Sequence, residues 1–92
     1  HGMYLQHAYG KKIDLQIRKN PAVPGHEKIV VTCAGADSAK IWIDQKMMGV
    51  FQGKDRFECE LRGIEKGTHL IFVETSSRGQ KIAVRPSIFD LS

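Results

Sequence analysis

Residues 39–51, Ala-Lys-Ile-Trp-Ile-Asp-Gln-Lys-Met-Met-Gly-Val-Phe, and residues 67–74, Gly-Thr-His-Leu-Ile-Phe-Val-Glu, decide the fold of this chain. In the first stretch, two runs rich in apolar side chains flank the polar Asp44-Gln45-Lys46, which is typical of a β-hairpin with a tight turn. In the second, a glycine opens a run whose side chains alternate with the period of two of a β-strand. Both stretches therefore predict β-structure.

The same two-residue period recurs along the rest of the chain, between turn signals about eight to twelve residues apart. Further strands are predicted near Ile13–Ile17, Ile29–Cys33, Phe57–Leu61 and Gln80–Arg85. Segments rich in proline, glycine and aspartate separate them, because these residues interrupt strands and favour turns. No stretch of ten residues or more keeps the helical period of 3.6, so no substantial helix is expected. About seven short strands predict an all-β sandwich.

The chain has 92 residues, of which 41% are hydrophobic. This length supports one packed core and leaves little room for a deep active site. We interpret residues 1–3, His-Gly-Met, as the remnant of an expression tag, residues 4–10 as a lead-in segment and residues 11–92 as a single domain. No apolar run approaches the roughly 18 residues of a membrane span, and no signal peptide is recognisable.

The formal net charge of +4 permits an anionic partner. However, the 14 Lys and Arg residues are scattered, and only Lys11-Lys12 and Arg18-Lys19 are adjacent. This pattern favours an evenly solvated surface over a nucleic-acid-binding tract. Nucleic acid is therefore not the expected partner.

The order of the motifs resembles that of bacterial Ig-like, or fibronectin-like, modules appended to cell-envelope and carbohydrate-active enzymes. It is also similar to the C-terminal domain of some bifunctional penicillin-binding proteins, where a Trp precedes the hairpin. In such modules an Asp-Gly-Lys hairpin and a strand that begins Gly-x-His recur, as at residues 44–46 and 67–69 here. The resemblance covers roughly Lys28–Arg85 and implies an Ig-like sandwich of about seven antiparallel strands.

Gln45 departs from this pattern, because it stands where the resembled modules have glycine. A two-residue type I′ turn needs a positive φ at both central residues, which glutamine tolerates poorly. We therefore expect a longer or bulged loop at this hairpin.

Cys33 and Cys59 are too few for a disulfide scaffold and lack the Cys-x-x-Cys spacing of zinc or redox sites. They fall on the inward phase of the second and fifth strands, which are neighbours in an Ig-like sheet, so both thiols are expected side by side in the core. Two readings are open. The favoured one is a free buried pair that packs like small apolar residues; the other is a cross-strand disulfide that would add about 3 kcal/mol.

Strand alternation places several apolar side chains on the outer side of one sheet. If Ile41 and Ile43 face the core, Trp42 faces out, and the strand of residues 68–74 likewise turns Leu70 and Phe72 outward. In the last strand, Ile82 and Val84 are expected inside, and Lys81, Ala83 and Arg85 outside. The predicted binding residues are the apolar trio and a cationic margin: Trp42, Leu70, Phe72, Lys40, Lys81 and Arg85.

Several readings of this face remain open. A β-bulge would shift the phase and turn Trp42 inward. A terminal segment, Tyr4–Tyr9 or Ser87–Leu91, would cover the apolar side chains within the domain. Alternatively, the face docks a neighbouring domain or protomer, or binds a ligand, because monomers rarely leave such patches without use.

Catalytic and metal chemistry find little support in the sequence. His69 is expected as an inward, hydrogen-bonded core residue, since no Ser or Cys nucleophile lies in a recognisable motif near it. The four histidines are dispersed, and Asp14, Asp44 and Asp55 lack the spacing of a calcium loop. We therefore predict no enzyme activity, no metal and no cofactor.

The predicted function is that of a non-catalytic accessory or interaction domain, which docks or positions a neighbouring domain of a larger secreted or cell-envelope bacterial protein. This localisation, extracellular or in the cell envelope, is implied by the resemblance. A carbohydrate-binding module that uses Trp42 and Phe72 is the first alternative. A weak binder of anionic polymers, driven by the net charge, is the second.

Overall fold

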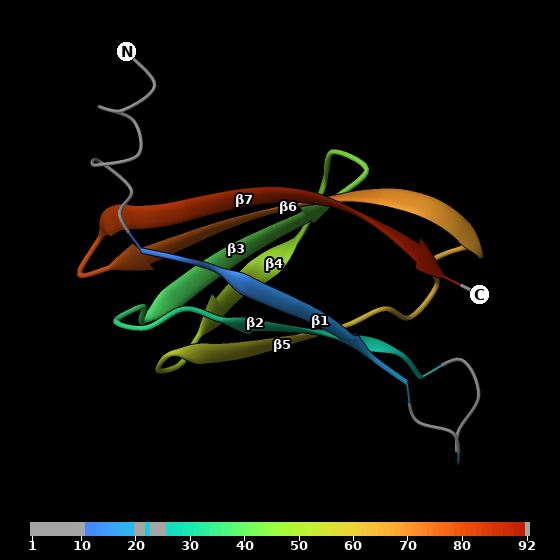
Figure 1. The fold of residues 1–92 in the computed structure, drawn as a ribbon, viewed down its shortest axis with the longest axis horizontal. Coiled ribbons are helices and arrows are strands. Elements are labelled where there is room, and N and C mark those ends of the chain that lie inside the picture. Colours follow the sequence, from blue (N-terminus) through green and yellow to red (C-terminus); the bar gives the residue numbers. More distant parts are fainter. Residues whose placement is uncertain (1–10, 20–21, 23–25, 92) are drawn as a thin grey trace.

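The computed structural model describes residues 11–19, 22 and 26–91, which form seven antiparallel β-strands in two packed sheets (Figure 1). The strands are β1 (Asp14–Arg18), β2 (Lys28–Thr32), β3 (Ser38–Ile43), β4 (Lys46–Gln52), β5 (Arg56–Glu60), β6 (Gly67–Ser77) and β7 (Gln80–Leu91). These described residues contain no helix, so the prediction of an all-β sandwich is confirmed. The predicted tag remnant and lead-in segment, residues 1–10, lie outside the described residues.

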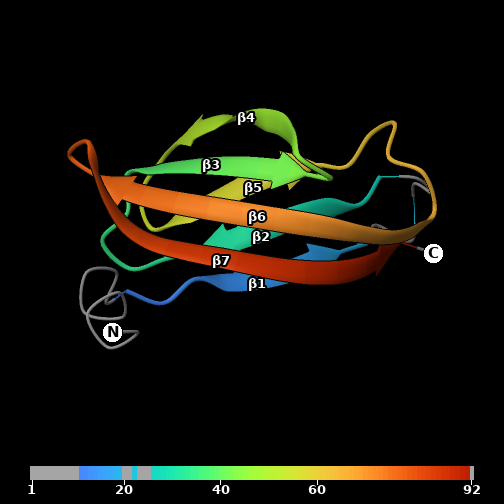
Figure 2. The same ribbon diagram turned by 90° about the horizontal axis from the view of Figure 1, so that it is seen from above.

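The smaller sheet has the strand order β1-β2-β5 and the larger sheet the order β4-β3-β6-β7. Seen from above, the strands of the larger sheet lie side by side over the smaller sheet (Figure 2). The second and fifth strands are neighbours, and the third, sixth and seventh share a sheet. This is the distribution expected of an Ig-like sandwich.

The core lies between the two sheets and follows from the alternation of each strand. Ile29 and Val31 of β2 face Ile41 of β3 and Ile71 and Val73 of β6, and all five are at most 2% exposed. Each of these residues is followed by an outward side chain, because successive strand residues point to opposite faces. The outward residues therefore form two outer sheet faces, and candidate binding residues lie on these faces.

β6 and β7 form a longer hairpin than the sequence predicts, joined by Arg78 and Gly79 with φ values of 53° and 80°. The register pairs Thr75 with Ala83 but Ser76 with Lys81, so Ile82 is the extra residue of a β-bulge. The bulge inverts the phase of β7 beyond Lys81. Ala83 is therefore buried and Val84 is 37% exposed, and the prediction that Val84 lies inside and Ala83 outside is wrong.

The hairpin between β3 and β4 has a two-residue turn despite its glutamine. Ile43 pairs with Lys46, and Asp44 and Gln45 have φ values of 50° and 70°. The expectation of a longer loop is therefore wrong, although the hairpin does contain a bulge, at Met48 in β4. Asp44 offsets the strain of the turn, since its backbone N–H donates to Leu70 O at 2.8 Å and its carboxylate accepts from Leu70 N at 3.0 Å.

Both cysteines lie in the core as free thiols, but they are not side by side. Cys59 pairs with Ile29, whereas the backbone N–H of Cys33 donates to Asp55 O at the other end of the sheet. Four register positions separate the two, or roughly 13 Å along the strands, which is too far for a disulfide. Cys33 Sγ instead lies 3.3 Å from Thr75 Oγ1 across the core. At the other end of the sheet, burial raises the pKa of the Cys59 thiol.

Candidate docking surface

The outer face of the larger sheet is lined with apolar side chains from all four strands. Cross-strand pairing aligns Met47, Trp42, Phe72 and Pro86 in one row across β4, β3, β6 and β7. The next row toward the Asp44-Gln45 turn holds Leu70 opposite Ile88, and Val50 and Val84 end the row on the other side. We call these eight residues the apolar face: Val50, Met47, Trp42, Phe72, Leu70, Val84, Pro86 and Ile88.

The exposure of large hydrophobic side chains is concentrated on this face. Among the described residues, all exposed large hydrophobics belong to it, from Phe72 and Val84 at 37% to Ile88 at 70%. A monomer exposes isolated apolar residues routinely, but a contiguous patch of this kind is typical of an interaction site. The apolar face is therefore the strongest candidate for a functional surface.

Trp42 and Phe72 form the centre of the apolar face. Their ring centroids lie 5.6 Å apart at an interplanar angle of 61°, which is an edge-to-face contact. Together with Leu70 and Gln45 they line an open depression of about 360 Å³. The structure thus places Trp42, Leu70 and Phe72 on one outer face. The bulge beside Trp42 leaves it outward, because the extra residue, Met48, is in β4.

A charged cluster borders the apolar face on the side away from the Asp44-Gln45 turn. Glu74 Oε1 lies 2.6 Å from Lys81 Nζ, and Glu74 Oε2 lies 4.0 Å from Lys40 Nζ. Both lysines of the predicted cationic margin are therefore on this face, where one carboxylate lies between them. The cluster is less cationic than the sequence suggested.

Arg85 is not part of the outer face, and its predicted position there is wrong. Because the bulge at Ile82 inverts the phase, Arg85 pairs with the buried Val73 and points toward the smaller sheet. Its guanidinium Nη1 donates to the carbonyl oxygen of Ile13 at 2.7 Å. Arg85 therefore links β7 to the segment that leads into β1.

His69 and Asp44 connect β6 to the hairpin turn at one end of the face. His69 Nδ1 lies 2.6 Å from Asp44 Oδ2, and His69 Nε2 lies 2.6 Å from the carbonyl oxygen of Glu65. Two acceptors favour the doubly protonated ring, so the hydrogen bond to Asp44, and next that to Glu65, raises the pKa of His69. The same bond to His69, aided by Leu70 N–H, lowers the pKa of Asp44. With both nitrogens engaged, the ring acts as a structural clamp.

The outer face of the smaller sheet has the opposite character. Pairing arranges its outward residues in three rows of three, and only the central one, Val30, is aliphatic. Lys28 Nζ pairs with Glu58 Oε1 at 2.7 Å, and Arg56 also pairs with Glu58. We call these nine residues the polar face: Asp14, Gln16, Arg18, Lys28, Val30, Thr32, Arg56, Glu58 and Glu60.

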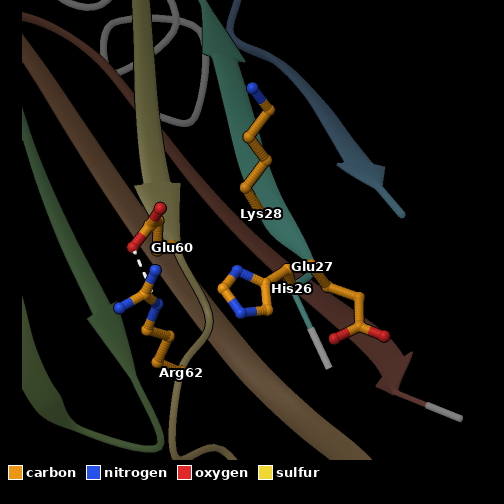
Figure 3. Close-up of a pocket in the computed structure, with 5 residues that line it drawn as sticks. All are labelled: His26, Glu27, Lys28, Glu60 and Arg62. Carbon is orange, nitrogen blue, oxygen red and sulfur yellow. Dashed lines mark ion pairs between the residues drawn. The ribbon is translucent and has the colours of Figure 1, made fainter. Parts of the chain in front are cut away.

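A small polar hollow of about 160 Å³ lies at one end of the polar face. Figure 3 shows His26 beside the pair formed by Glu60 and Arg62, whose Oε2 and Nε atoms are 3.2 Å apart, with Glu27 and Lys28 around it. Its two acidic and two basic side chains balance one another in charge. Such a lining is typical of a solvated, ion-paired surface.

Sequence reasoning missed five members of the apolar face: Met47, Val50, Val84, Pro86 and Ile88. Ile88 and Pro86 alternate with the partly buried Phe89 and Ser87, so the period of two was available as a signal. The last strand predicted from the sequence ends near Arg85, before these residues. In the structure, Ser87–Leu91 continues β7 and enlarges the apolar face, so this segment does not cover the apolar side chains.

Comparison of the chain with known protein families, with curated proteins and with solved structures found no match. In the part of the chain that the structure describes, no three His, Cys, Asp or Glu side chains are grouped to hold a metal ion. Nor do the described residues include a helix that could cross a membrane. The apolar face is therefore the feature on which a functional assignment rests.

Proposed function

We propose that this domain is a non-catalytic interaction module whose apolar face docks onto another folded protein surface. The observation that carries the proposal is the gathering of all exposed large hydrophobics of the described residues on one sheet face. Water contact with such a patch is unfavourable, and covering it with a complementary apolar surface releases that cost. In keeping with the modules that the chain resembles, its place would be a larger secreted or cell-envelope protein.

The shape of the face suits a flat protein partner. Four adjacent strands offer a broad surface that a second sheet can cover, as in sheet-on-sheet packing. The edge-to-face pair of Trp42 and Phe72 provides aromatic anchors at its centre, where interfaces concentrate their binding energy. The charged cluster of Lys40, Glu74 and Lys81 supplies a polar rim on one side.

The carbohydrate-binding alternative has weaker support. Sugar sites combine a stacking ring with several polar groups that bind hydroxyls. Among the described side chains that line the depression, only Gln45 and the indole N–H of Trp42 offer polar groups. Titration with a panel of soluble glycans should therefore leave the fluorescence of Trp42, the single tryptophan, unchanged. Saturable quenching would instead favour the carbohydrate module.

Site-specific photo-crosslinking tests the docking function. A benzophenone amino acid replaces Ile88, which is 70% exposed on the apolar face, and a matched variant carries it at the exposed Gln16 on the polar face. In the protein as its own cells produce it, irradiation should join position 88 to a defined protein segment, and position 16 should give no defined product. Equal, diffuse labelling from both positions would contradict the proposal.

A further inference from the structure

We infer that the surface covered by the apolar face is the same face of a second copy of this chain, which gives a twofold dimer of stacked larger sheets. This inference rests on the proposed docking function and names the partner. The supporting observation is the order of charges across the sheet.

The geometry follows from the strand order β4-β3-β6-β7. A homodimer interface is isologous, so a twofold axis relates the two faces. An axis that runs along the strands, midway between β3 and β6, lays β3 of one copy over β6 of the second and β4 over β7. Aligned sheets pack in this way with a twist of about 30°.

This axis brings like chemistry together in the central rows. In the row Met47–Trp42–Phe72–Pro86, Trp42 faces Phe72 of the second copy, and Met47 faces its Pro86. In the neighbouring row, Val50 faces Val84 of the second copy. The aromatic centre of each face is thus covered by the aromatic centre of the other.

The charged residues are self-complementary under the same axis. The row Val50–Lys40–Glu74–Val84 carries a cation on β3 and an anion on β6. Because β3 lies over β6, Lys40 faces Glu74 of the second copy and Glu74 faces its Lys40. Two reciprocal ion pairs therefore border the apolar centre, and such complementarity selects one register.

A twofold axis perpendicular to the strands gives a poorer match. Centred on the Trp42 row, it lays each strand over its own copy and sets Glu74 against Leu70 of the second copy. Glu74 then gains no cation from the second copy, whereas the axis along the strands supplies Lys40. The charge order therefore favours the axis that runs along the strands.

The area limits the dimer to weak affinity. With strands about 4.8 Å apart and outward rows about 6.8 Å apart, the three outward rows that span all four strands cover roughly 400 Å² of each copy. Two copies then bury about 800 Å², which is below the range of about 1,200–2,000 Å² for stable interfaces and within that of weak, transient ones. We therefore expect a dimer that forms only at high concentrations of the chain.

Sedimentation velocity on the purified 92-residue chain, from about 10 μM to 1 mM, tests the dimer through two charge-reversed variants. Lys40→Glu sets two carboxylates against each other at each pair, and Glu74→Lys sets two ammonium groups. Each variant alone should weaken the dimer at least about tenfold. An equimolar mixture of the two should restore it as a heterodimer, because the carboxylate introduced at position 40 of one variant then faces the ammonium group introduced at position 74 of the other. Thr32→Lys on the polar face is the matched control and should change nothing.

Circular dichroism and thermal unfolding of each variant establish that it is folded. A monomer at every concentration overturns the second copy as partner, and so does a dimer that neither Lys40→Glu nor Glu74→Lys weakens. The crosslink from position 88 separates this failure from that of the proposed function. A monomeric chain whose position 88 joins another protein, or another domain of its own protein, keeps the docking function and excludes the dimer. A monomeric chain without that crosslink overturns both.

Discussion

The polar face and the apolar face are built on the same alternation, one on each side of the sandwich, yet they present opposite chemistry. On the polar face, Val30 sits at the centre and is only 3% exposed, because long side chains such as Gln16 and Glu58 flank it across the strands. On the apolar face, Phe72 occupies the matching central position and is 37% exposed. The long side chains of the polar face therefore bury its central residue. No side chains of the described residues bury the central residue of the apolar face to the same extent.

This difference distinguishes a face that is suited to contact with water from one that is not. Exposed ion pairs on the polar face, such as that of Lys28 with Glu58, contribute little to the free energy of folding. They do keep this face hydrated, so that it offers no apolar surface to other proteins. The apolar face omits such pairs except at the cluster of Lys40, Glu74 and Lys81. A sheet face that contacts only water would be expected to carry polar and charged side chains, as the polar face does.

The largest effect is expected in the core that both faces share. Ile41 is fully buried at the centre of β3, and Ile41→Ala removes its contacts with both sheets. We expect the free energy of unfolding to fall by about 3–4 kcal/mol, as measured by urea denaturation. Phe72→Ala on the apolar face is the comparison. A loss as large for Phe72→Ala as for Ile41→Ala would mean that the apolar face is structural.

Two valines make the comparison of the faces itself quantitative. Val30→Ala on the polar face removes two buried methyl groups and should lower the free energy of unfolding by about 1.5 kcal/mol. Val50→Ala on the apolar face, where the side chain is 52% exposed, should lower it by less than about 0.5 kcal/mol. Both are measured at a dilution where the chain is monomeric. Equal losses would show that Val50 is covered within the chain.

The fold was predictable because the two-residue period is strong in every strand and the turns are well marked. The same period placed Trp42, Leu70 and Phe72 on one face, as the structure has them. It failed in β7, where one extra residue at Ile82 exchanged the positions of Ala83 and Val84 and took Arg85 from the outer face. A bulge of this kind depends on tertiary packing and leaves no local sequence signal.

The prediction of a longer loop at Asp44-Gln45 failed for a related reason. Local propensity disfavours a positive φ at glutamine, but the hydrogen bonds of Asp44 to Leu70 and His69 come from a strand about 25 residues further along the chain. Such long-range bonds override local preference and cannot be read from the turn itself. They also determine the pH dependence of this end of the apolar face.

A smaller effect, on stability as a function of pH, is expected from the clamp between Asp44 and His69. The folded protein raises the pKa of His69 above its ordinary 6.5, so the stabilisation from His69 is complete below 6.5 and is lost as the pH rises through the raised value. The pKa of Asp44 is lowered from 3.8, so its contribution is present above 3.8 and is lost as the pH falls through the lowered value.

Stability from this pair is therefore greatest between 3.8 and 6.5. The melting temperature should fall slightly as the pH rises from about 5.5 to about 8.5, and His69→Gln should remove that part of the fall. A melting temperature with the same pH dependence in the wild type and in His69→Gln would exclude the clamp.

The adjacent residues Met47 and Met48 allow the most direct test of the apolar face as a docking surface. Met47 is 44% exposed on that face, whereas Met48 packs against the core, so Met48 serves as an internal reference in hydroxyl-radical footprinting read by mass spectrometry. Oxidation of Met47 relative to Met48 should be high in the dilute chain and should fall when the chain is concentrated or held in its native assembly. A ratio that stays constant across these states would contradict the assignment of the apolar face as a docking surface.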